Sequence, residues 1–215
     1  MDIQYRKIIS LIIAALSICI CVICTSCSDT MVELPVLYPK VIYSYDSDTT
    51  EPDSVLSIYS QVKSDAVRLS SMTVQHGESG LSWYIQPVSI MADSKGIQYA
   101  GSSNLKMPEG QHFPEGLYTI IYKDYAGNTE VSTFTLENTA LEQMPESAGV
   151  YGKFIVYNNR QDVLYISSDT NDVSDTMENL SARFADAESI REYISDIRKK
   201  AVYILPAQTV RTTDE

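Results

Sequence analysis

Residues 114–136 constrain the fold of this chain more than any other stretch. They contain two runs, 117–123 and 131–136, in which apolar or aromatic residues alternate with other residues at a period of two. A short polar link joins the runs. Period-two alternation on both sides of a Gly-Asn turn predicts a β-hairpin. The residues that carry the pattern are Tyr118, Ile120, Gly127, Asn128 and Phe134.

The four residues Glu115-Gly116-Leu117-Tyr118 resemble the start of strand F in immunoglobulin-type domains. In that family the tyrosine hydroxyl bonds to nearby backbone, and an inward residue, here Ile120, stands where antibody domains place their second cysteine. The resemblance implies that Trp83 is the core tryptophan of strand C and the packing partner of Tyr118. It also implies that either Met72 or Val74 replaces the first cysteine.

Residues 51–138 are also similar to bacterial Ig-like and PKD-type extracellular repeats. The similarity lies in a tyrosine-bearing strand, an Asp-x-Ala-Gly-Asn turn and a threonine-rich last strand. Further short strands are expected near residues 55–62, 72–74, 81–86 and 104–107, separated by glycine-bearing turns. This organisation predicts a mainly β fold, an antiparallel Ig-like sandwich without a disulfide. An antiparallel sheet of another topology stays open.

All four cysteines lie in residues 19–27, so nothing after Cys27 can form a disulfide or supply a thiolate. Arg6-Lys7 precedes the apolar run 8–23, and Thr25-Ser26 stands directly before Cys27. This layout resembles the signal of bacterial lipoproteins, which are cleaved before a cysteine that then carries lipid. It implies a signal peptide over residues 1–26 and lipidation, including a fatty acyl chain such as palmitate, at Cys27. Cys24 is a second candidate, and an uncleaved membrane anchor is the alternative.

The lipoprotein resemblance places the rest of the chain in the bacterial cell envelope, facing the periplasm or the exterior. Residues 27–50 are expected to be a lipid-anchored tether with a first edge strand at 41–45. The acidic loop that follows, 46–53, lacks the glycine and glutamate of an EF-hand, so a solvated loop is favoured over calcium.

Residues 139–206 are expected to form a small α+β unit of ββαβ order, either independent or docked on the sandwich. A second hairpin is predicted at 153–157 and 163–167, and a strand at 202–205. Ile190, Tyr193, Ile194 and Ile197 recur with helical spacing and predict an amphipathic helix. Residues 177–184 can add another helical stretch, and 207–215 are expected to be disordered.

The formal net charge of −12 disfavours nucleic acid and bare anionic lipid as partners, because like charges repel at close range. The chain has two histidines, His76 and His112, which are expected in exposed loops, and it shows no metal-binding, phosphate-binding or dinucleotide motif. We therefore expect a non-enzymatic protein without a cofactor that serves partner binding, adhesion or envelope architecture. A glycan-binding or glycan-processing accessory lipoprotein is the alternative.

Tyrosine is the unusual component of the composition, with 15 residues against 4 phenylalanines and 1 tryptophan. Tyrosine suits recognition surfaces because its ring is rigid and amphipathic, although half-buried strands also accept it. An exposed patch for a protein or glycan partner is therefore sought among six tyrosines: Tyr43, Tyr45, Tyr59, Tyr84, Tyr99 and Tyr125.

Overall fold

The protein is described here from a computed structural model. The structure describes residues 32–47, 51–63, 65–137, 144–147, 153–167 and 176–209. Val32–Glu215 forms one compact unit. The predicted signal peptide, with Cys24 and Cys27, lies outside the described residues.

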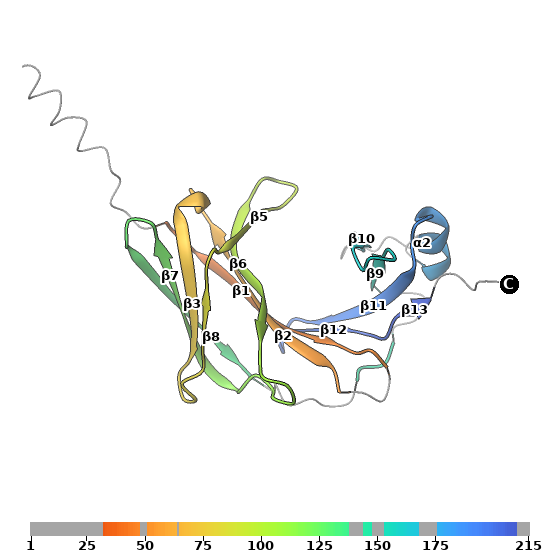
Figure 1. Ribbon diagram of the computed structural model, residues 1–215, viewed down its shortest axis with the longest axis horizontal. Helices are drawn as coiled ribbons and strands as arrows, with labels where there is room; N and C mark the ends of the chain where they lie inside the picture. The colour runs from red at the N-terminus through yellow and green to blue at the C-terminus, as the bar shows by residue number, and fades with distance from the viewer. Residues whose placement is uncertain are drawn as a thin grey trace, which may run out of the picture. The chain divides into compact units, whose positions relative to one another are not determined.

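The described chain is mainly β and forms two sheets (Figure 1). The larger sheet has the strand order β10-β9-β11-β12-β1-β2-β6-β5, with β13 paired to β11. Its strands are β1 (Val36–Ser44), β2 (Asp53–Val62), β5 (Ser89–Ala92), β6 (Gln98–Lys106), β9 (Lys153–Tyr157), β10 (Val163–Ile166), β11 (Ser189–Asp196), β12 (Ala201–Ile204) and β13 (Gln208–Thr209). The smaller sheet has the order β4-β3-β7-β8, formed by β3 (Leu69–His76), β4 (Ser82–Ile85), β7 (Gly116–Asp124) and β8 (Thr129–Leu136).

The smaller sheet packs against strands β1, β2 and β6 of the larger one, an arrangement consistent with a β-sandwich. The buried hydroxyl of Tyr122 in β7 donates to the carbonyl oxygen of Ala100 in β6 at 3.0 Å, which ties the two sheets together. Leu56, Ile58 and Ile120 are fully buried in the core. We call strands β1–β8 the sandwich. The predicted mainly β fold without a disulfide is confirmed.

The predicted hairpin is formed by β7 and β8, whose register runs from Gly116 opposite Leu136 to Lys123 opposite Thr129. The turn between them contains Gly127 at φ 92°. A positive φ is a conformation that glycine adopts without the steric cost of a Cβ. Local chemistry therefore fixes this hairpin.

The first strand differs from its prediction. β1 is a full strand that begins at Val36, inside the predicted tether, and it lies between β2 and β12 rather than at an edge. The sandwich consequently begins before residue 51. The first cysteine of immunoglobulin-type domains faces strand F from the other sheet. The prediction that Met72 or Val74 takes its place is therefore wrong, because Val74 and Ile120 are neighbours in the same sheet.

The C-terminal hairpin of β9 and β10 and the strand β12 lie where the sequence predicts them. The helix expected at residues 190–197 is wrong, because this segment is strand β11, paired with β9 and β12. Isoleucine and tyrosine favour strands when neighbours pair on both sides. Ile190 is fully buried while Ile197 is 82% exposed, so the two do not share an apolar face.

One short α-helix, α2 (Met177–Arg183), occurs within the described residues, at the second helical stretch that the sequence indicates. The Thr176 hydroxyl oxygen caps its start by accepting from the Asn179 N–H at 3.2 Å. Leu180 of this helix packs with Phe154, Val156, Ala187 and Ile190 in a small second core.

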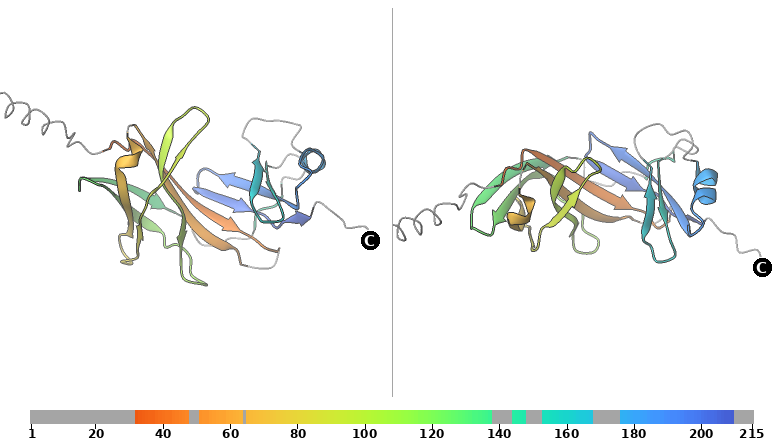
Figure 2. Two further views of the ribbon diagram at one scale, coloured as in Figure 1. Left: turned by 45° about the horizontal axis from the view of Figure 1, so that its top comes forward. Right: turned by 90° about the horizontal axis from the view of Figure 1, so that it is seen from above.

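The larger sheet runs without a break from the sandwich into the C-terminal strands (Figure 2). β12 pairs in parallel with β1 from Val41 opposite Ala201 to Ser44 opposite Ile204. Lys200, in the turn before β12, donates from Nζ to the carbonyl oxygen of Thr135 in β8 at 2.8 Å. The C-terminal strands are therefore an extension of the sandwich sheet. Gln208 and Thr209, expected to be disordered, form β13.

Candidate functional site

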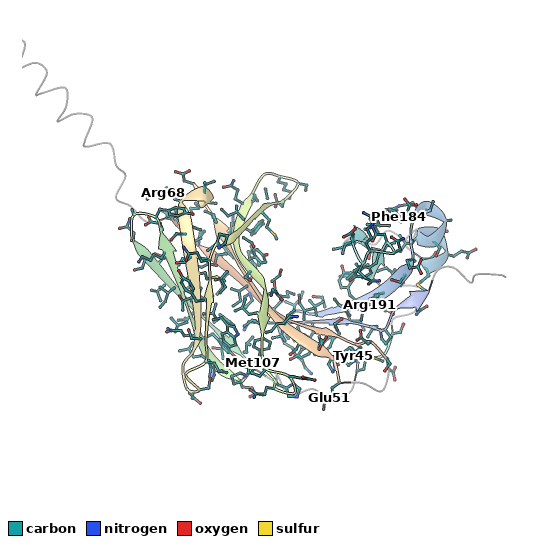
Figure 3. The ribbon with its side chains drawn as sticks, viewed as in Figure 1. Tyr45, Glu51, Arg68, Met107, Phe184 and Arg191 are labelled. Carbon is teal, nitrogen blue, oxygen red and sulfur yellow. The ribbon has the colours of Figure 1, made fainter. Side chains whose placement is uncertain are left out.

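The strands of the sandwich end in two groups of loops, which Figure 3 places at opposite ends by the labels Arg68 and Met107. We call residues 65–69, 93–97 and 124–128 the Arg68 end, since the strand registers bring these segments together. Residues 45–47, 51–52, 77–81 and 107–115 form the Met107 end. The two ends differ in their chemistry.

The Arg68 end is organised by Asp124, whose side chain is fully buried. One of its oxygens accepts from the backbone N–H of Asn128 at 2.9 Å, and the other accepts from the Asn128 side-chain amide at 3.1 Å. The guanidinium of Arg68 lies 3.1 Å from the same carboxylate. The N–H of Tyr125 donates to the carbonyl oxygen of Arg68 at 3.0 Å. Asp124 therefore joins the β7–β8 turn to the segment before β3.

The environment of Asp124 favours its charged form. Burial alone would raise the pKa of this carboxyl. Hydrogen bonds from Asn128 and from the backbone of Ala126, together with the positive charge of Arg68, outweigh burial and hold the pKa of Asp124 below its ordinary value. The Asp124 carboxylate therefore stays charged and holds the β7–β8 turn through its hydrogen bonds, which makes it a poor group for proton transfer.

This lowered pKa predicts a pH dependence of stability. A carboxyl whose pKa is lower in the folded chain stabilises the fold above its unfolded pKa of about 3.9, and this stabilisation disappears as the pH falls through the folded value. The urea midpoint of Asp124→Asn should lie below that of the parent from neutral pH to about pH 5, and the gap should narrow below about pH 4. Glu78→Gln, an exposed change at the Met107 end, should follow the parent curve; a gap for Asp124→Asn that stays constant to low pH would contradict the role of the charge.

A hollow of about 320 Å³ opens beside this turn. Two strongly exposed aromatic residues line it, Tyr84 at 65% and Tyr125 at 74% exposure. The Tyr84 hydroxyl donates to the side-chain oxygen of Gln86 at 2.7 Å. We call this site the tyrosine hollow. Its other lining residues include Ser71, Gln86, Lys123, Asp124 and Gly127. Aromatic walls with an amide, an ammonium and hydroxyls suit recognition of a polar ligand.

The six tyrosines expected to mark a patch divide into three groups. Tyr43 and Tyr45 are buried, and burial raises the pKa of Tyr43 to about 12. Tyr59 and Tyr99 are half-buried on the outer face of the larger sheet, where the ring of Tyr99 lies 5.8 Å from that of Tyr38. Only Tyr84 and Tyr125 are brought to one hollow.

Trp83, Tyr118 and Phe134, the aromatic residues on which the predicted sandwich depends, lie together near the start of β7. The ring of Tyr118 lies 5.0 Å from that of Phe134 and 6.5 Å from that of Trp83. The Tyr118 hydroxyl donates to the carbonyl oxygen of Pro114 at 2.7 Å, the backbone contact that the sequence predicts. Trp83 is only half-buried and lies on β4; its indole N–H donates to the carbonyl oxygen of Lys106 at 2.9 Å.

Removing the Tyr118 hydroxyl tests this contact. Tyr118→Phe keeps the ring stacking and leaves the Pro114 carbonyl without its donor, so it should lower the free energy of unfolding by about 1 kcal/mol. Urea denaturation followed by tryptophan fluorescence measures the change. Tyr84→Phe, on an exposed ring, is the matched control and should have little effect. Equal midpoints for Tyr118→Phe and the parent would show that the corner bond contributes nothing.

His76 is not the exposed loop residue that the sequence suggests. It is only 4% exposed and ends strand β3. Its Nε2 lies 2.8 Å from the Glu115 carbonyl oxygen, so it donates there, and Nδ1 then accepts from the Ser79 N–H at 3.1 Å. His76 thus pins the β3–β4 turn to the start of β7. His112 is exposed, as expected.

No local sequence pattern points to the contacts of Arg68 with Asp124 or of His76 with Glu115, because these partners are far apart in the chain. Among the described residues, no three histidine, cysteine or acidic side chains lie close enough to hold a metal ion. In that same part of the chain, no helix is long and apolar enough to cross a membrane.

Comparison of the chain with family models, with curated proteins and with solved structures finds no match.

Proposed function

We propose that the protein is an exported bacterial lipoprotein, anchored by lipid at Cys27, that acts as a non-enzymatic binding or architectural module of the cell envelope. The observation that carries the proposal is the order of the N-terminal residues: a basic start, the apolar run 8–23, and Thr25-Ser26 before Cys27. The sandwich follows within a few residues, since Val32 is already buried.

We infer that the sandwich is Ig-like. The strand orders β1-β2-β6-β5 and β4-β3-β7-β8 correspond to A-B-E-D and C′-C-F-G of immunoglobulin-type domains. With this lettering Tyr118 lies on strand F and its hydroxyl closes the corner on Pro114. Trp83 falls on C′ instead of C, one strand later than the sequence assigns it, because β1 supplies strand A.

Lipidation is tested by metabolic labelling with an alkyne-bearing fatty acid in a bacterial host. The full-length chain should be labelled, Cys27→Ala should lose the label, and Cys24→Ala should keep it. Full labelling of Cys27→Ala would overturn the assignment. Pull-down of the tagged, lipidated protein from native envelopes then tests the binding role. Recovery of no protein or glycan together with it would count against that role.

A glycan-binding accessory lipoprotein is the second candidate, and the tyrosine hollow favours it. Exposed Tyr84 and Tyr125 rings can stack on sugar rings while Gln86 and Lys123 offer hydrogen bonds. The carboxylate in its lining, Asp124, is held by Arg68 and Asn128, which favours binding over hydrolysis. Tyr84→Ala should abolish any signal on a glycan array, whereas Tyr38→Ala, exposed elsewhere, should preserve it; equal signals would exclude the hollow.

A further inference from the structure

We propose that the Arg68 end of the sandwich rests on the bilayer that holds the lipid of Cys27, with Val67 and Tyr125 in its headgroup layer. The Met107 end then points away from the membrane. This inference rests on the proposed lipidation and adds a second contact with the lipid surface, made by the folded domain itself.

The first argument is the reach of the chain. Val32 is 1% exposed and Leu34 6% exposed, so the polypeptide is packed against the sandwich from Val32 onward. Five residue steps separate Val32 from Cys27, and a fully extended chain covers about 3.6 Å per step, hence about 18 Å in all. The lipidated residue therefore cannot hold the domain far from the membrane.

The second argument is where the chain enters the domain. The Lys63 N–H donates to the carbonyl oxygen of Glu33 at 3.2 Å, and the Lys63 ammonium lies 2.6 Å from the Glu33 carboxylate. Lys63 directly follows β2 and precedes the segment with Val67 and Arg68. Val36, the first residue of β1, pairs with Gln61 near the end of β2. The short connection therefore enters at the Arg68 end.

The third argument is the distribution of exposed apolar surface. Val67 is 72% and Tyr125 74% exposed, and they project from two loops that the Tyr125–Arg68 hydrogen bond holds together. Tyrosine is enriched at membrane–water interfaces. Apart from Leu117, the other large hydrophobic residues exposed on the sandwich also lie at or toward this end: Val36, Tyr38, Tyr84, Ile90, Met91 and Val131.

The fourth argument is charge. At or toward the Arg68 end, four basic residues (Lys63, Arg68, Lys95 and Lys123) stand against five acidic residues (Glu33, Asp65, Asp93, Asp124 and Glu130). The Met107 end carries more acidic residues, with Lys106 and Lys200 as neighbouring bases: Asp46, Glu51, Asp53, Glu78, Glu109, Glu115 and Glu137. An anionic leaflet attracts basic groups and repels carboxylates. An anionic leaflet would therefore repel the Arg68 end less than it repels the Met107 end, so charge favours the same orientation as the tether.

Hydrogen exchange on the lipidated mature protein tests the orientation. It is measured in vesicles of phosphatidylethanolamine and phosphatidylglycerol and again in detergent micelles. Amides of residues 65–68 and 124–128 should exchange about fivefold more slowly in vesicles, whereas those of 107–115 should not change. Equal exchange at the Arg68 end in both media would overturn the inference while leaving lipidation intact. Protein that carries no lipid label would overturn the proposed function instead.

Variants of exposed residues test whether the side chains of Val67 and Tyr125 make the contact with the membrane. The double variant Val67→Asp, Tyr125→Asp should lose the slowed exchange but keep the lipid label and the parent urea midpoint, because both side chains are exposed. Ile197→Asp, at an 82% exposed site outside this end, is the matched control and should behave like the parent. As a second readout, brominated lipids should quench the fluorescence that Tyr125→Trp adds to that of the native Trp83, and they should not quench the fluorescence that His112→Trp adds. The reverse pattern would place the Met107 end on the membrane and refute the proposal.

Discussion

Gly101→Ala should be the most destabilising single-methyl change in the sandwich. A Cβ at position 101 would lie 1.9 Å from the carbonyl oxygen of Ile58 and 2.7 Å from the Cα of Tyr59. Both neighbours are backbone atoms, which cannot move aside as a flexible side chain can. The strand register between β2 and β6 shifts at this place, between Leu56 and Ile58. The close approach is therefore built into the irregularity of the sheet.

We expect Gly101→Ala to lower the free energy of unfolding by about 3 kcal/mol or more, the upper range for inserting a methyl group into packed structure. Urea denaturation of the purified protein measures it. Ser103→Ala, on an exposed position of the same strand, should change the midpoint little. A Gly101→Ala protein as stable as the parent would mean that β2 and β6 are not in this register.

Ile190→Ala should destabilise the whole described unit, including the sandwich to which Ile190 does not belong. Ile190 is fully buried with Phe154, Val156 and Leu180, and truncation of such a side chain costs about 3 kcal/mol. Because β12 pairs with β1 and Lys200 bonds to Thr135, loss of the C-terminal strands removes support from both sheets. Unfolding should therefore be cooperative across the C-terminal extension.

Trp83 makes this prediction measurable, because it is the only tryptophan and lies in the sandwich on β4. The fluorescence midpoint of Trp83 should shift in Ile190→Ala together with the midpoint seen by far-ultraviolet circular dichroism. Ile197→Ala, on an 82% exposed side chain, should leave both midpoints in place. An unshifted Trp83 transition beside a shifted circular dichroism transition would show that the C-terminal strands unfold alone.

What the sequence predicts well is local. The β7–β8 hairpin and its Gly127 turn follow from alternation and turn chemistry within a few residues, and so do β9 with β10. The segment 190–197 shows the limit of this reasoning. Its apolar spacing fits a helix, but β9 and β12 offer backbone partners on both sides, and those contacts depend on residues far away in the chain.

In the candidate site, too, local features can be predicted from the sequence and long-range contacts cannot. Tyr84 and Tyr125 could be named from composition alone, but nothing in the sequence separates them from Tyr43 and Tyr45, which the fold buries. The pairing of Arg68 with Asp124 bridges 56 positions, and the contact between His76 and Glu115 bridges 39. Such contacts follow from sheet register, which propensity and spacing do not determine.

The central position of β1 has a mechanical consequence. β1 pairs with β2 along its whole length and with β12 over its second half. Because β1 and β12 run in parallel, tension between a membrane anchor on the N-terminal side of β1 and a load on the C-terminal side of β12 would act along both strands. The hydrogen bonds between them lie across that direction, so they would share the force in shear rather than open one after another. A chain anchored before β1 would thus bear load through the middle of its largest sheet.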